Sequence, residues 1–206
     1  MYVQAMEKVV KSLNKRIVIG VTGASGIPVT VNILQLLKLE ANYESHLVIS
    51  ESGKITIGYE SEYSVSQIEA MADCVYDTHE IGAAIASGTF RSEGMIVVPC
   101  SMKTAAGVAS GYSDSLLLRA ADVMLKERRK LVLMIRECPL NSIHTRNIQC
   151  LANAGADILP LVMTFYNHPK TIEDMVYHLS CKALERFGIA VPHFRRWMES
   201  MEEGGE

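Results

Sequence analysis

The chain has 206 residues, a length that fits one large domain or one domain with tails. Apolar residues make up 49% and charged residues 21%, which excludes a disordered, collagen-like or disulfide-scaffold chain. The formal net charge of −3 argues against a nucleic-acid partner. No apolar run is long enough for a membrane helix, and the N-terminus has no apolar signal-peptide core, so we expect no membrane partner either.

The cysteines are odd in number and widely spaced: Cys74, Cys100, Cys138, Cys150 and Cys181. Neither a CxxC pair nor an HExxH motif occurs, so the sequence predicts no metal site. The favoured interpretation is a set of reduced thiols in a cytoplasmic protein.

Short runs rich in Val and Ile alternate with longer amphipathic segments. The runs predict strands at Arg16–Val21, His46–Ile49, Met95–Pro99, Leu131–Ile135 and Asp157–Pro160. The amphipathic segments predict helices at Val29–Leu39, Val65–Ala72, Ser115–Lys130, Thr145–Ala154 and Ile172–Phe187. Near-continuous apolar strands are typical of a parallel sheet buried on both faces. The sequence therefore predicts an α/β, Rossmann-like (flavodoxin-like), doubly wound parallel sheet with helices on both faces, in three layers.

This pattern predicts one domain over residues 15–198. We expect residues 1–14 to form an N-terminal extension and residues 199–206 to form a frayed acidic tail. Trp197 is expected to be a packing anchor rather than a ligand contact.

Ligands of such sheets bind beyond the carboxyl ends of the strands, and polar motifs follow the first two predicted strands. Gly20–Gly26 (GVTGASG) opens a helix, where glycines and free N–H groups suit a phosphate. A packing turn without a ligand is the alternative. Ser50 ends the second strand, where the role of a helix N-cap is favoured over ligand contact, and Glu60 follows ten residues later.

The third motif, Pro99–Thr104 (PCSMKT), follows the third strand. Ser101, Lys103 and Thr104 offer donors at another helix start, a pattern suited to an anion or a polar ring edge. Cys100 is expected to be a small buried residue rather than a nucleophile.

A fourth motif is strongly basic. Residues 119–136 carry six basic and two acidic side chains, for which a solvated charged face is the alternative interpretation. Arg136 and Glu137 end an apolar strand, where a charged pair is costly unless it is used or paired. His144 is a candidate acid, although a role at a helix start is at least as well supported.

A last motif, Phe165–Pro169 (FYNHP), follows the fifth strand. Tyr166 within it could donate to a phosphate, which Lys182 could neutralise. Taken alone, Lys182 would be interpreted as a surface residue.

Together these motifs resemble the UbiX-type flavin prenyltransferases, a family that includes the B subunits of non-oxidative hydroxyarylic acid decarboxylases. The matching segments are GASG (Gly23–Gly26), HLVIS (His46–Ser50), PCSMKT (Pro99–Thr104), RAADVMLKERRKLVL (Arg119–Leu133), RECPLNSIH (Arg136–His144) and FYNHP (Phe165–Pro169). The resemblance runs from about Lys15 to Trp197, nearly the whole chain.

The resemblance implies an FMN-binding domain that joins the dimethylallyl group of dimethylallyl phosphate to N5 and C6 of reduced FMN, without a metal. It implies that prenylated FMN then serves a UbiD-type decarboxylase, and that the chain forms a dodecamer with the site between subunits. One alternative is a non-catalytic FMN-binding subunit of a decarboxylase complex. Two others are an oxidative decarboxylase of a cysteinyl substrate, disfavoured by the basic residues, and a nicotinamide reductase in which TGASG serves as a dinucleotide loop.

By position, the resemblance assigns flavin contacts to Gly23, Ala24, Ser25, Ser50, Ser101, Met102, Lys103, Thr104 and Arg136. It assigns prenyl-phosphate contacts to Tyr166 and Lys182, and further active-site roles to Glu60, Arg119, Lys126 and Glu137. We expect the four cations Arg119, Lys126, Arg136 and Lys182 to gather around one pocket and stabilise the leaving phosphate. Glu137 is a candidate for proton transfer at ring closure, with an ion pair to Arg136 as the alternative.

Overall fold

The computed structural model describes residues 14–194 and 196, which form one six-stranded, all-parallel sheet. Its strands are β1 (Lys15–Val21), β2 (Tyr43–Ile49), β3 (Cys74–Tyr76), β4 (Gly94–Cys100), β5 (Lys130–Ile135) and β6 (Asp157–Ile158). Their order, β3-β2-β1-β4-β5-β6, is that of a doubly wound Rossmann sheet and confirms the predicted fold class. The expected N-terminal extension, apart from Asn14, lies outside the described residues, as do the acidic tail and Trp197.

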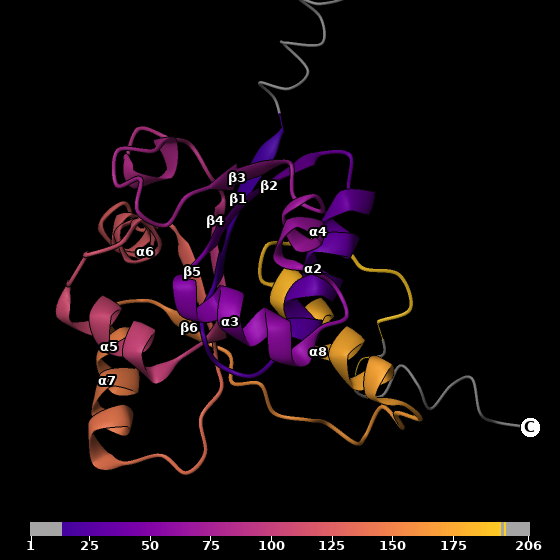
Figure 1. Ribbon diagram of the computed structural model, residues 1–206. Coiled ribbons are helices and arrows are strands. Elements are labelled where there is room, and N and C mark those ends of the chain that lie inside the picture. Colours follow the sequence, from indigo (N-terminus) through magenta and orange to yellow (C-terminus); the bar gives the residue numbers. More distant parts are fainter. Residues whose placement is uncertain (1–13, 195, 197–206) are drawn as a thin grey trace, which may run out of the picture.

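Helices cover both faces of the sheet (Figure 1). They are α2 (Ile27–Leu39), α3 (Glu51–Glu60), α4 (Val65–Glu69), α5 (Met102–Ser110), α6 (Leu116–Lys126), α7 (Ser142–Asn153) and α8 (Ile172–Glu185), with a 3-10 turn η1 at Ala84–Ala86. No helix of the described residues is both long and apolar enough to span a bilayer.

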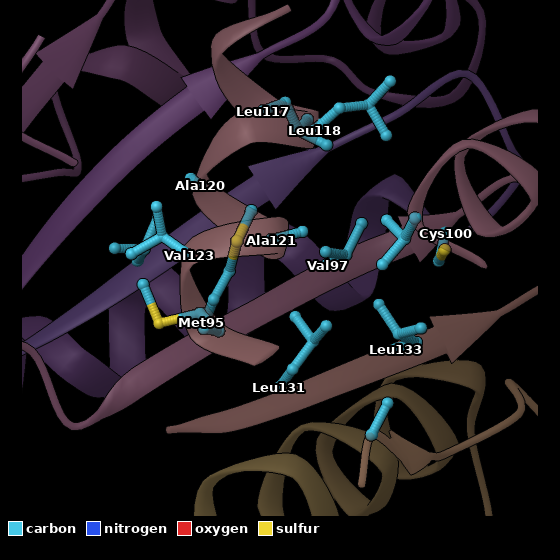
Figure 2. Packing of buried hydrophobic residues seen from close by; sticks show 14 of the residues in the cluster. Met95, Val97, Cys100, Leu117, Leu118, Ala120, Ala121, Val123, Leu131 and Leu133 are labelled. Atoms are coloured by element: carbon cyan, nitrogen blue, oxygen red, sulfur yellow. The ribbon is translucent and has the colours of Figure 1, made fainter. Parts of the chain in front are cut away.

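The alternation of side chains along each strand produces two apolar cores. One core joins the sheet to α2, α3, α4 and α8, and the other joins it to α5, α6 and α7. Figure 2 shows the second core, where Met95, Val97 and Leu131 from β4 and β5 face Ala121 and Val123 from α6. Each fully buried aliphatic side chain of this kind contributes roughly 1.5–3 kcal/mol. The site at the sheet edge is therefore built on a rigid scaffold.

Most predicted elements are present, with shifted boundaries. The fifth predicted strand is wrong beyond Ile158, where β6 ends. The predicted helix 115–130 is also too long, since Ser115 is its N-cap and it ends at Lys126. Arg128 then takes a positive φ of 54°, which breaks the helix before β5. Helix α3 and strand β3 were not predicted, and α5 was expected only as a helix start.

The direction of winding reverses between β1 and β4. From β1 the chain moves outward through β2 to β3, and from β4 it moves the other way through β5 to β6. The loops that follow β1 and β4 therefore diverge at the carboxyl ends of these two strands. Such a switch point is where doubly wound sheets bind ligands.

Candidate functional site at the carboxyl edge of the sheet

Three helices begin side by side at the carboxyl edge, each directly after a strand. They are α2 after β1, α3 after β2 and α5 after β4, and these strands are neighbours in the sheet. Ser50 caps α3 by accepting the N–H of Gly53 at 3.1 Å, and Ser101 caps α5 by accepting the N–H of Thr104 at 3.3 Å. The predicted N-cap role of Ser50 is confirmed. Three helix N-termini together create a positive end that suits a phosphate.

The glycine loop before α2 has no side-chain cap of its own. Instead, Oε2 of Glu60 accepts the N–H of Gly26 at 2.8 Å and the N–H of Ile27 at 3.1 Å. Gly26 has φ 131°, and a Cβ there would lie 2.5 Å from Leu161 Cδ1. A Cβ on Gly23 would lie 2.6 Å from the Cβ of Ser52. The loop therefore needs glycine for its turn and for its close packing.

Glu60 is ionised in this setting. Burial opposes its charge, but hydrogen bonds from Ser25, Gly26 and Ile27 and the nearby Arg136 guanidinium outweigh burial and lower the Glu60 pKa. Arg136 follows β5, so the end of a fourth strand reaches the same place. The structure thus brings Ser25, Glu60 and Arg136 together.

Thr22 holds the two loops of the switch point together, a role that the sequence did not indicate. Its fully buried hydroxyl donates to the carbonyl of Pro99 at 2.7 Å and accepts the N–H of Ser101 at 2.9 Å. The strand ends of β1 and β4 are therefore fixed relative to each other. The one signal that could have pointed to this role is a Thr directly after an apolar strand and before a glycine loop.

We call the residues at this edge the carboxyl-edge cradle: Gly23–Gly26, Ser50, Glu60, Ser101–Thr104 and Arg136. The side chains of Ala24, Met102 and Thr104 are buried. Ala24 and Met102 can therefore offer a ligand only their backbone or an apolar edge. Lys103 is exposed at the start of α5 and adds a mobile positive charge to the cradle.

Two of the predicted cations lie elsewhere in the chain, so the expectation of one pocket holding all four is wrong for a single chain. Lys126 ends α6 four residues before β5, at the amino end of the sheet, and pairs with Glu127. Arg119 pairs with Asp122 at 2.7 Å and donates to the carbonyl of Ala86 at 3.2 Å. The reason is topological, because α6 returns the chain from the carboxyl edge to the amino edge.

Tyr166, in the loop before α8, and Lys182, on α8, form a third group. The hydroxyl of Tyr166 lies 3.4 Å from Nε2 of His178. Burial lowers the pKa of His178, and the charge of Lys182, one turn further along the helix, lowers it as well. The Tyr166 hydroxyl and the Lys182 cation therefore border the same buried histidine.

The remaining candidates have local roles as well. Glu137 is exposed, and its carboxylate accepts the N–H of Cys138 at 3.1 Å; among the described residues it forms no ion pair with Arg136. His144 joins Asn141 in a capping box at the start of α7, which confirms the helix-start interpretation. Cys100 is fully buried, and burial raises its pKa to about 12, so the interpretation as a buried packing residue is confirmed.

Known proteins share this architecture over most of the chain. Residues 6–183 match the model of the Flavoprotein family. The flavin prenyltransferase LpdB of Lactiplantibacillus plantarum is 49% identical over 89% of this chain and 98% of its own. The chain belongs to the UbiX-like flavin prenyltransferases.

Two solved UbiX structures agree with the fold in detail. A dodecameric FMN-dependent UbiX-like decarboxylase from Escherichia coli O157:H7 has a TM-score of 0.87 and 47% identity, over 89% of this chain and 99% of that one. A UbiX protein in complex with FMN and dimethylallyl pyrophosphate has a TM-score of 0.87 and 45% identity, over 89% of this chain and 97% of that one.

The cradle of this UbiX-like chain fits a flavin mononucleotide. The N-termini of α3 and α5 suit the charge of a phosphate, and Arg136 adds a permanent cation, whereas Glu60 already accepts the N–H groups of Gly26 and Ile27 at the start of α2. A Cβ at Gly23 or Gly26 would meet Ser52 or Leu161, so both glycines are needed for the packing that shapes the loop.

Proposed function

We propose that this chain transfers the dimethylallyl group of dimethylallyl phosphate to N5 and C6 of reduced FMN, releasing phosphate and prenylated FMN. The carboxyl-edge cradle at the switch point is the observation that carries the proposal. The UbiX relative solved with FMN and dimethylallyl pyrophosphate supports both ligands.

The residues of the cradle bind and orient the flavin. Ser50 and Ser101 offer hydroxyl groups beside two helix N-termini, and Lys103 and Arg136 offer cations. When bound, reduced FMN supplies the two nucleophilic ring atoms. Holding the prenyl carbon against them contributes much of the acceleration, since orientation of this kind can be worth roughly 7–11 kcal/mol.

The leaving phosphate needs cations that one chain does not place at its own cradle. We propose that Arg119 and Lys126 on α6, Tyr166 in the loop before α8, and Lys182 on α8 reach the cradle of neighbouring copies in a homododecamer. The dodecameric state of the Escherichia coli relative supports such an assembly. Each preorganised donor of this kind is worth about 2.7–4 kcal/mol of transition-state stabilisation.

Two carboxylates act in this proposal. Glu60, ionised at neutral pH, fixes the glycine loop by binding the N–H groups of Gly26 and Ile27, and it faces the bound flavin from there. Glu137, exposed beside Arg136, moves a proton at ring closure, between the phosphate and the flavin.

The product serves a UbiD-type aromatic acid decarboxylase in this proposal, and residues 15–198 act as one FMN-binding domain. All five cysteines are free, which supports the cytoplasm as the compartment.

A product assay separates the proposal from its alternative, a non-catalytic FMN-binding subunit. The protein is incubated with reduced FMN and dimethylallyl phosphate, and the flavin mass and the released phosphate are measured. Prenyl transfer predicts a flavin heavier by one C5H8 unit, with one phosphate released for each. Bound FMN of unchanged mass would defeat the transferase proposal and support the alternative.

A further inference from the structure

A cluster of three potential metal ligands lies at the amino end of β2 and β3, away from the cradle. Glu44 and His46 belong to β2, and Cys74 is the first residue of β3. Ser50, in the cradle, is four residues beyond His46, about 13 Å along the strand direction. The cluster is therefore separate from the flavin site.

The register of the sheet brings the three side chains to one face. Glu44 and His46 are two positions apart on the same strand, so they point the same way. Cys74 pairs with His46 across the two parallel strands, which puts its thiol on that face too. Spacing along the chain could not indicate this group, because the ligands come from two strands 28 residues apart.

The distances suit a small cation. His46 Nε2 lies 3.6 Å from Glu44 Oε2, and Cys74 Sγ lies 3.6 Å from Glu44 Oε1. The three ligand atoms are all within 4.8 Å of one another. Bonds of about 2.0–2.3 Å at tetrahedral angles place zinc ligands roughly 3.3–3.6 Å apart. The contacts of His46 and of Cys74 with the Glu44 carboxylate both have about this length, each to a different oxygen.

The buried ring of His46 supplies an independent indication. The residue is 3% exposed, and its Nε2 atom makes no hydrogen bond, since Glu44 Oε2 lies beyond hydrogen-bond distance at 3.6 Å. The other ring nitrogen, Nδ1, lies 2.9 Å from the hydroxyl of Tyr76. A metal-binding histidine usually has such an outer partner, which fixes the ring while the second nitrogen faces the metal.

We propose that Glu44, His46 and Cys74 bind one divalent cation of the zinc class, with a water molecule in the fourth position. A nitrogen, a thiolate and a carboxylate form a typical ligand set for Zn2+. On binding, the S–H bond of Cys74 breaks, a metal–sulfur bond forms, and the proton passes to the solvent. No change of oxidation state is involved.

The ion pair of Glu44 with Arg16 agrees with this assignment. Arg16 pairs with Glu44 Oε2 at 3.1 Å, which leaves Oε1 beside the thiol. Ligating carboxylates commonly keep such an outer hydrogen bond. Cation, carboxylate and thiolate together are neutral, so Arg16 faces no net positive charge.

The bound cation would join β2 to β3, the short edge strand. Only three residues of β3 pair with β2, and β3, as an edge strand, has only this one neighbour in the sheet. Metal bonds through Cys74 would therefore stabilise a short edge strand of the sheet.

Cobalt titration tests the proposal, because Co2+ replaces Zn2+ and has visible absorption. The full-length protein is reduced, treated with a chelator, and titrated with Co2+ alone. We expect one equivalent per chain, a thiolate-to-cobalt charge-transfer band, strong tetrahedral d–d bands, and loss of all bands on addition of Zn2+. Absence of the charge-transfer band at one equivalent would overturn the proposal.

Variants identify the ligands. Cys74→Ser should remove the charge-transfer band, and Glu44→Gln should weaken Co2+ binding at least about tenfold. The double variant Cys138→Ser/Cys150→Ser is the matched control, because both of these thiols are exposed, and it should bind as the parent does. A band that persists in Cys74→Ser, or that the control removes, would contradict the assignment. FMN binding should stay unchanged in all three variants and reports that they are folded.

Discussion

Replacing Thr22 by valine tests how the two loops of the switch point are held. Valine keeps the shape of threonine and removes the hydroxyl, which joins the carbonyl of Pro99 to the N–H of Ser101. Thr22 is fully buried, so no water can replace the hydroxyl at that position.

The expected loss of stability follows from the two backbone groups that valine would leave unpaired. Pro99 is buried, and an unsatisfied buried carbonyl costs about 1–3 kcal/mol. Ser101 is half-buried, so we take the lower end, about 1 kcal/mol, for its N–H. The sum predicts that Thr22→Val lowers the free energy of unfolding by about 2–4 kcal/mol.

Urea unfolding at fixed protein concentration, followed by far-UV circular dichroism, measures this free energy. Thr22→Ser is the matched control, since it keeps the hydroxyl and loses one methyl group, at about 1 kcal/mol. FMN affinity should fall in Thr22→Val and persist in Thr22→Ser. The reasoning is refuted if valine is no more destabilising than serine.

Four other predictions follow from the site. Gly26→Ala should weaken FMN binding, because φ 131° disfavours alanine and its Cβ would meet Leu161; titration of FMN fluorescence checks this, and unchanged affinity would contradict it. Glu137→Gln should slow prenyl transfer while FMN still binds, and a variant with the full rate would exclude a proton role. Lys182→Ala should raise the KM for dimethylallyl phosphate far more than the Kd for FMN, and an equal loss of both would contradict the assignment. The folded-state pKa of Glu60 is lowered, so its stabilising effect is present above the usual glutamate pKa and lost as the pH falls through the lowered value. The stability difference between the parent and Glu60→Gln should therefore be largest near pH 7 and shrink in acid, and a difference that grows in acid would show the opposite sign.

The parallel strands could be predicted because their apolar runs are almost continuous. Strand β3 could not, since it has three residues and none is fully buried. Helix α3 contains two glycines and buries only Gly53 and Ile57, so its sequence lacks a clear amphipathic pattern. Its position depends on the Ser50 cap and on the bonds that Glu60 makes at its far end.

The cradle was predictable because each of its motifs directly follows a strand. The cations on α6 and α8 were not, because a charged residue on an exposed helix face does not indicate which end of the sheet it borders. Topology gives the missing information for Lys126, since a residue just before β5 must lie at the amino edge. The cluster of Glu44, His46 and Cys74 depends on strand register, which sequence spacing does not contain.

The central claim is that one active site combines the cradle of one chain with phosphate cations from another. Mixed assemblies of Arg136→Ala and Lys182→Ala chains, co-expressed with two tags and purified through both, test it by the rate of flavin mass gain. Each variant alone should be nearly inactive, and the mixture should regain about a quarter of the parent rate, because random mixing completes that share of sites between chains. A mixture as inactive as the two single variants would contradict the claim.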